Sequence, residues 1–189
     1  VTNGVVVINP EAIAEQLEAA KAQVAAAKAA GKEILVVCEK KMYAEELEAL
    51  AAKAGVAFLN YKVSGGFLTN FDTFKKRIDS INEMVSFMET DAFASLTKKE
   101  QLVYKRNFER ANKVYKGVTK LKKRPELVII VDGNMLSTLI DEVENLKGKL
   151  EAIVIAGTNF SRYWPENEII TTNINSYQSL DFVLKSILL

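Results

Sequence analysis

Apolar runs and helix-forming segments alternate along most of the chain. Residues 34–38, 56–59, 127–131 and 153–156 are continuous apolar runs, and 5–8 is a shorter one. Unbroken runs of this kind are typical of parallel strands that are covered on both faces. Helical segments lie between and after them, at 11–30, 42–54, 135–146 and 176–188. The alternation predicts an α/β sandwich of three layers, with a parallel sheet of about five strands.

The stretch 72–124 departs from this alternation because it contains no apolar run. Its apolar residues instead recur in steps of four and three, which give a period of 3.5. Two such series occur: Phe74, Ile78, Ile81, Val85 and Met88, then Tyr104, Phe108, Ala111, Tyr115 and Val118. Two series joined by a short connector predict an antiparallel coiled-coil hairpin that protrudes from the sandwich. We therefore divide the chain into a sandwich domain, 1–71 with 125–189, and an inserted hairpin, 72–124.

The beginning of the second hairpin helix has its own signal. In Thr97-Lys98-Lys99-Glu100, the Thr hydroxyl and the Glu carboxylate can each bind a free backbone N–H of the first turn. We expect the helix to begin at this capping box. Lys98, Lys105, Lys113 and Lys116 fall outside the apolar series and are expected to face solvent.

The net charge of +1 conceals an uneven distribution. Residues 97–124 carry eleven basic and two acidic side chains, whereas 1–60, 61–96 and 125–189 sum to −2, −1 and −5. A helix face that only needs to be soluble usually mixes both signs. The excess favours binding to a polyanion over mere solubility. The predicted RNA-binding residues are Lys98, Lys99, Lys105, Arg106, Arg110, Lys113, Lys116, Lys120, Lys122, Lys123 and Arg124.

Candidate catalytic chemistry is sparse. The chain has no histidine, which excludes histidine-based triads and the usual zinc sites. Its one cysteine, Cys38, lies in a predicted strand and is expected to be a core residue in a reducing compartment. We predict no catalytic residue, metal or cofactor. No run of eighteen apolar residues occurs, so no membrane span is expected.

Two other positions allow alternative interpretations. Asp132 follows a predicted strand at the place where doubly wound folds hold ligands. We favour the alternative that it caps the next helix. Trp164, with Tyr163 and Phe160 nearby, is either a stacking surface or, as we favour, a segment packed on its own domain.

The segment Gly65 to Thr73 is the most specific motif. Its glycines permit backbone conformations closed to other residues, and Thr69 or Asn70 can cap the following helix. The string resembles the Gly-Gly-x-Leu-Thr-Asn-Phe-x-Thr signature of the S-two family of small-subunit ribosomal proteins. The matching residues are Gly65, Gly66, Leu68, Thr69, Asn70, Phe71 and Thr73. Leu96 to Glu100 is similar to a second family motif. Weaker matches are Asn3-Gly4, Lys40-Lys41, Pro125 and Thr158-Asn159.

The resemblance implies a flavodoxin-like sandwich with a protruding coiled coil, and a structural role without catalysis. It implies small-subunit ribosomal RNA and neighbouring ribosomal proteins as partners, with no small-molecule substrate and no membrane. The expected location is the cytoplasmic ribosome, with an organellar ribosome left open. The alternatives from the residues are a flavodoxin-like enzyme or nucleotide-binding module with a helical insertion, and a protein-binding coiled-coil adaptor.

Three features depart from the family pattern. Val63 stands where the family usually has Trp, and Lys116-Gly117-Val118 stands in place of a Gly-Gly-Ile turn. The chain also begins without Met and without the family's N-terminal segment. We expect it to be a trimmed version of something longer, and contacts made through that segment, including support for protein S-one, are not carried over.

Overall fold

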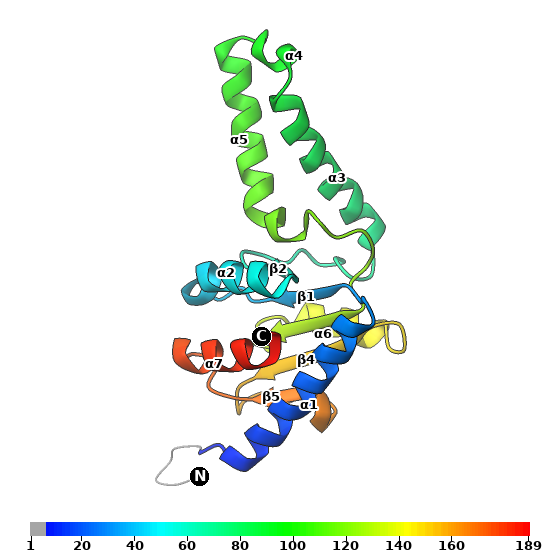
Figure 1. Ribbon diagram of the computed structural model, residues 1–189, viewed down its shortest axis with the longest axis vertical. Helices are drawn as coiled ribbons and strands as arrows, with labels where there is room; N and C mark the ends of the chain where they lie inside the picture. The colour runs from blue at the N-terminus through cyan, green and yellow to red at the C-terminus, as the bar shows by residue number, and fades with distance from the viewer. Residues whose placement is uncertain (1–6) are drawn as a thin grey trace.

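The computed structural model describes residues 7–189, apart from the side chain of Glu166. Its five parallel strands form one sheet in the order β2-β1-β3-β4-β5 (Figure 1). This is the flavodoxin-like order, so the predicted α/β class is confirmed. The strands are β1 (Ile34–Val37), β2 (Ala57–Leu59), β3 (Leu127–Val131), β4 (Glu151–Ala156) and β5 (Ile169–Thr171).

One strand lies elsewhere than predicted. Of the expected strand 5–8, Val5 and Val6 lie outside the described residues, and Val7 and Ile8 form no strand. The Asn9 side chain accepts a hydrogen bond from the Glu11 N–H at 3.1 Å, so this segment leads directly into a helix. The edge of β4 pairs instead with β5. This strand has only two apolar residues, so its sequence gives little indication of a strand.

Helices cover both faces of the sheet. One face packs against α1 (Pro10–Ala29), α2 (Ala44–Ala54) and α7 (Tyr177–Leu188). The other packs against α6 (Ser137–Asn145) and the lower parts of α3 (Phe71–Met88) and α5 (Lys98–Tyr115). Adjacent residues of the central strands, such as Ile129 and Ile130, are fully buried on opposite faces. This two-sided burial explains why the strands are unbroken apolar runs.

Short elements complete the fold. They are the 3-10 helices η1 (Lys41–Tyr43), η2 (Lys116–Val118) and η3 (Glu166–Glu168), and the short helix α4 (Asp91–Ala94). The element η2 packs against β2, which is an edge strand of the sheet. A covered edge strand is less available for pairing with another chain.

Helices α3 and α5 rise together beyond the β2 edge of the sheet, with α4 at their tip (Figure 1). At the tip, the Phe87 ring centroid lies 5.2 Å from that of Tyr104 and 5.9 Å from that of Phe93. The predicted capping box is confirmed. The Thr97 hydroxyl accepts from the Glu100 N–H at 3.3 Å, and the Glu100 carboxylate accepts from the Thr97 N–H at 2.9 Å.

Burial along α3 depends on distance from the sheet. Phe74, Ile78 and Ile81 are buried in the same hydrophobic cluster as the sheet, whereas Val85 is 40% exposed. The lower part of the helix is therefore a layer of the sandwich, and the upper part packs only against α4 and α5 among the described elements. A continuous coiled-coil seam, and domain boundaries at 72 and 124, stay predictions.

Candidate nucleic-acid interface

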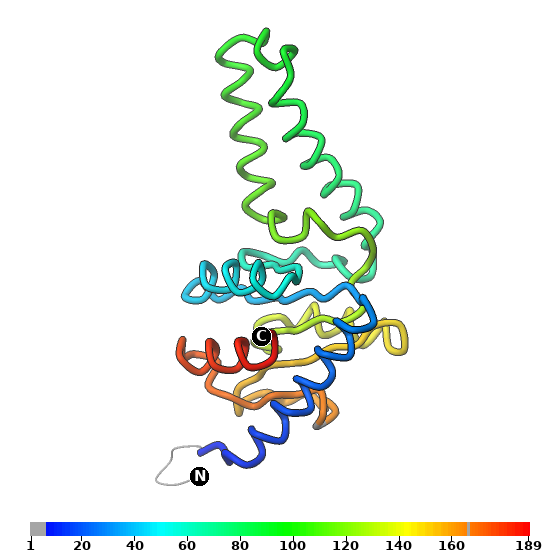
Figure 2. Tube along the Cα trace, viewed as in Figure 1, coloured from blue at the N-terminus to red at the C-terminus, as the bar shows by residue number. Residues whose placement is uncertain are grey.

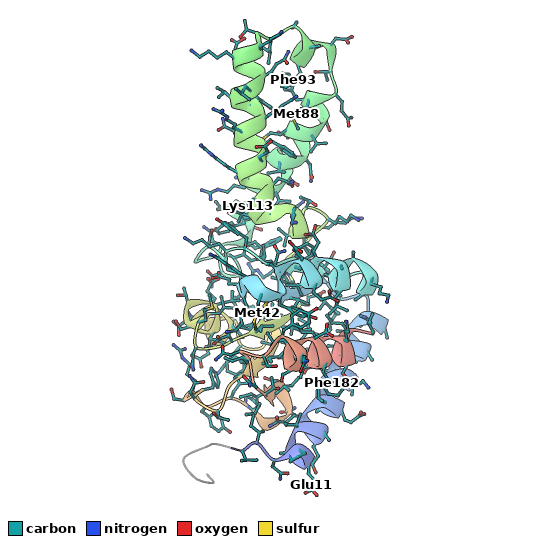
Figure 3. The ribbon with its side chains drawn as sticks, turned by 90° about the vertical axis from the view of Figure 1, so that its left-hand side faces the viewer. Glu11, Met42, Met88, Phe93, Lys113 and Phe182 are labelled. Atoms are coloured by element: carbon teal, nitrogen blue, oxygen red, sulfur yellow. The ribbon has the colours of Figure 1, made fainter. Side chains whose placement is uncertain are left out.

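One side of α5 presents a row of basic side chains. Six exposed residues form this α5 basic row: Lys98, Lys99, Lys105, Arg106, Arg110 and Lys113. At 3.6 residues per turn they fall within an arc of about 140°, on the side opposite Tyr104, Phe108 and Tyr115. Figure 3 shows nitrogen-tipped side chains projecting from α5 away from α3. The geometry suits contact with an extended anionic surface.

Most of these charges are not neutralised within the chain. Among residues 7–189, no acidic side chain pairs with any of the first five members of the row. Lys113 lies with its ammonium 4.4 Å from the centroid of the Tyr61 ring, which fixes its position while leaving it exposed. Glu109 is the one acidic residue of α5 on the same arc. The row is therefore a net positive surface.

Lys116 departs from the prediction of a solvent-facing side chain. It is half-buried because its ammonium pairs with the Glu48 carboxylate of α2. The pair joins the foot of α5 to the sandwich. Lys116 thus has a partner within the fold and does not belong to the row.

The remaining predicted residues lie in a different place. Lys120, Lys122, Lys123 and Arg124 belong to the return segment, residues 119–126, which runs from the foot of α5 to the start of β3 (Figure 2). The Lys123 ammonium lies 2.8 Å from the Glu126 carboxylate. This lysine, and then the Glu33 N–H, hold the pKa of Glu126 below its ordinary value. The structure thus divides the predicted basic residues between two sites.

The signature loop, Gly65 to Thr73, is held by a carboxylate from α6. Glu142 is 6% exposed, and its oxygens accept from the backbone N–H groups of Gly66 at 2.6 Å, Leu68 at 2.8 Å and Thr69 at 3.1 Å. Successive N–H groups around one anion form an anion-binding nest. Here the anion is the chain's own side chain, so the loop fastens the start of α3 to α6.

Three residues of the loop, Gly66, Thr69 and Asn70, show how its backbone and side chains are arranged. Gly66 has φ 85°, in the left-handed region that favours glycine. The predicted side-chain cap at Thr69 or Asn70 is wrong, because Asn70 makes no cap bond to α3 and Thr69 turns its N–H and hydroxyl to Glu142. The Asn70 side-chain oxygen instead accepts from the Thr73 hydroxyl at 3.0 Å. The motif therefore has a structural role.

The carboxyl ends of β1 and β3 are joined by an ion pair. The Lys40 ammonium lies 2.8 Å from the Asp132 carboxylate, and both side chains are largely buried. The other Asp132 oxygen accepts from the Met135 N–H at 3.1 Å, within the turn that precedes α6. The prediction that Asp132 caps the next helix is wrong, because α6 begins at Ser137 with Leu136 as its N-cap and has no side-chain cap. Ligands of flavodoxin-like folds bind where these strand ends meet. In this chain a pair of its own side chains bridges that position.

A cavity of about 630 Å³ lies beside this pair, at the ends of β3, β4 and β5. Its described lining is rich in neutral polar residues such as Asn134, Thr158 and Asn173, and Asp132 is the one ionisable member. Because Asp132 is engaged by Lys40, the described part of the lining offers no uncommitted acid or base. General acid–base catalysis requires such a group within reach of the substrate.

Two further predictions concern packing. Trp164 is 9% exposed and belongs to the hydrophobic cluster beneath α6, so the interpretation that it packs on its own domain is confirmed. Tyr163 beside it is 92% exposed. Cys38 is fully buried, and burial raises the pKa of its thiol to about 11. The thiol is therefore protonated at neutral pH and acts as a core residue.

Comparison with known protein families gives a match along nearly the whole chain. The sequence model of the family described as ribosomal protein S2 matches residues 1–188. The chain belongs to the ribosomal protein S2 family. The resemblance carried by the two motifs is thereby confirmed.

Relatives named as small ribosomal subunit proteins align with three quarters or more of the chain. The small ribosomal subunit protein uS2 of Francisella tularensis subsp. holarctica is 31% identical over 187 residues, which are 98% of this chain and 76% of the relative. The protein of the same name from Francisella philomiragia is 30% identical over the same length and shares of both chains. That of Coprothermobacter proteolyticus is 34% identical over 144 residues, 76% of this chain and 54% of the relative.

Two positions where the chain departs from the usual S2 pattern pack against the sandwich, and nothing in the structure explains why Val63 stands in place of Trp. Val63 is partly buried against the α6 side of the core, and its N–H donates to the Glu39 carboxylate at 2.6 Å. Gly117 passes so close to β2 that a Cβ atom there would lie 2.2 Å from the Phe58 carbonyl oxygen. Position 117 therefore has room only for glycine.

Within residues 7–189, no helix is both long and apolar enough to cross a membrane.

Proposed function

We propose that this S2-family chain is a non-catalytic structural component of the small ribosomal subunit, and that the α5 basic row binds ribosomal RNA. Family membership supports the ribosomal role, because the relatives are named small ribosomal subunit proteins. The single observation that supports the RNA contact is the row itself. Its six basic side chains are exposed on one arc, and none of them has an acidic partner within residues 7–189.

The chemistry of such a contact is electrostatic. Lys and Arg side chains neutralise RNA phosphates and release the counterions condensed on them, so the affinity falls as salt rises. A helix with basic residues on one side cannot enter the narrow major groove of A-form RNA to read bases. The contact would therefore follow RNA shape and phosphate positions. The more acidic sandwich would face neighbouring ribosomal proteins.

The proposal is tested by titrating the protein with small-subunit ribosomal RNA over a range of salt concentrations. The variant carries four charge reversals on the row, written K98E, K105E, R106E and R110E. Each lost phosphate contact reduces the slope of log affinity against log salt by about 0.7 to 0.9. We expect the slope to fall by about three, with a large loss of affinity at low salt.

A matched control separates position from total charge. The control variant reverses four exposed lysines of the sandwich, which are Lys21, Lys41, Lys53 and Lys147. Both variants have the same net charge, so a nonspecific effect would lower both affinities equally. The proposal predicts that the control retains most of the wild-type slope. Equal slopes for wild type and the α5 variant would overturn it.

A further inference from the structure

A second basic site lies where the sandwich meets the foot of α3. A groove of about 450 Å³ opens there, at the amino ends of β3 and β4. Three segments that are distant in sequence form its walls: the first turns of α3, the return segment and the turn before β4. The lining residues are Phe71, Asp72, Lys75, Lys122, Lys123, Arg124, Pro125, Glu126 and Lys149. We call it the amino-end groove.

The groove carries a net positive charge of three, from five basic and two acidic side chains. Lys75 pairs with Asp79 of α3 at 2.6 Å, and Lys123 pairs with Glu126 at 2.8 Å. The other three basic residues, Lys122, Arg124 and Lys149, have no ion-pair partner within residues 7–189. The fold thus gathers like charges without neutralising them, which costs electrostatic energy until an anion binds.

Two further observations point to an anion in this groove. The Arg124 Nε–H is buried and has no hydrogen-bond acceptor among the described residues. In addition, Phe71 and Asp72, the first residues of the 18-residue helix α3, line the groove. The Asn70 side chain makes no cap bond to this helix end. A helix start presents N–H groups and the positive end of its dipole, and it stabilises phosphate.

We infer that the amino-end groove binds a backbone phosphate of ribosomal RNA, as a second contact separate from the α5 basic row. The inference rests on the proposed function, because it takes the same RNA as the ligand. It adds Lys75 and Lys149, which no sequence pattern indicated, to the residues that face RNA. The return segment connects the two sites from the foot of α5 to the start of β3 (Figure 2).

Two contacts on one rigid body would do more than add affinity. The α5 row alone can slide along phosphates, because its charges are spaced along a helix. A second contact at a different place restricts that sliding and raises the effective concentration of RNA at the row. The groove would therefore set the position of the sandwich on the RNA.

The test compares two lysines of the same turn. Lys149 lines the amino-end groove and Lys147 does not, and both are exposed. We expect K149E, combined with K122E, to reduce the salt slope of RNA binding by about 1.5, from two lost contacts. K147E should leave the slope within error of wild type. Urea denaturation should show that all three proteins unfold at similar midpoints.

Hydroxyl-radical footprinting of the bound RNA separates this inference from the proposed function. The groove variant should lose protection at nucleotides different from those lost in the α5 variant. If the groove variant keeps the slope and footprint of K147E while the α5 variant loses both, the groove inference is wrong and the proposed function stands. If the α5 variant also binds like wild type, the proposed function is wrong.

Discussion

The Lys40 ammonium and the Asp132 carboxylate lie 2.8 Å apart and join the loops that follow β1 and β3. Lys40 also donates to the Asn175 side-chain oxygen at 3.1 Å, so it links three segments at the carboxyl ends of the strands. Asp132 has φ 70°, a conformation that non-glycine residues seldom adopt. The contacts with Lys40 hold Asp132 in this backbone conformation.

Replacing Lys40 by Met should destabilise the sandwich. The change leaves the Asp132 carboxylate largely buried without its partner, and we expect the free energy of unfolding to fall by about 2 to 4 kcal/mol. Lys41→Met is the control, since Lys41 is exposed, and its effect should stay below about 0.5 kcal/mol. Urea denaturation measures both. Equal midpoints for the two variants would show that the ion pair adds nothing to stability.

Glu142→Gln should loosen the signature loop. One side-chain oxygen becomes an NH₂ group that cannot accept from the loop N–H groups, and we expect a loss of about 1 to 3 kcal/mol. Hydrogen exchange should be faster at the amides of Gly66, Leu68 and Thr69, which are the donors to this carboxylate. Glu144→Gln on the same helix is the control. The Glu144 side chain is half-exposed, and its carboxylate lies 3.8 Å from the Arg162 guanidinium and not against the loop. Unchanged exchange at these amides in E142Q would refute the role of Glu142.

Gly117→Ala should be the most disruptive glycine substitution at the foot of α5. The added Cβ would lie 2.2 Å from the Phe58 carbonyl oxygen, so η2 must move away from β2. We expect a cost of about 1 to 3 kcal/mol. In Gly65→Ala, the added atom would meet Thr138 at 3.7 Å, an ordinary contact. Calorimetry should therefore give a lower Tm for G117A than for G65A, and the reverse order would contradict the packing described.

Glu100 provides a pH-dependent test of the capping box. The Thr97 hydroxyl, and then the Thr97 backbone N–H, donate to this carboxylate and lower its pKa. Since the folded-state pKa lies below the unfolded one, the stabilisation is present above the ordinary carboxyl pKa. It is lost as pH falls through the folded-state pKa. NMR titration should give Glu100 a pKa below the ordinary glutamate value, and Thr97→Ala should move it back towards that value.

Short sequence patterns were sufficient to predict much of the fold. The Thr97 to Glu100 box is complete within four residues, and the apolar runs that form β1, β3 and β4 are visible in sequence because both faces of these strands are buried. The strand β5 gave no such signal. It is three residues long, and its pairing with β4 depends on the assembled sheet edge.

The candidate site was less predictable because its contacts join distant segments. Glu142 lies 74 residues from Leu68, and no periodicity connects a helical glutamate to the amides of a remote loop. For the same reason, sequence could not show that Glu48 neutralises Lys116, or that Lys149 lines the same groove as Arg124. A cluster of basic residues predicts positive charge, and the fold decides which of those charges stay free.

The central claim is that the α5 basic row holds this S2-family chain on the small ribosomal subunit. The most direct measurement is co-sedimentation with small subunits that lack their S2 protein, for wild type, the α5 four-charge variant and the sandwich control. We predict that wild type and control sediment with the subunit, and that the α5 variant stays in the supernatant at physiological salt. Sedimentation of the α5 variant to the same extent as the control would contradict the claim.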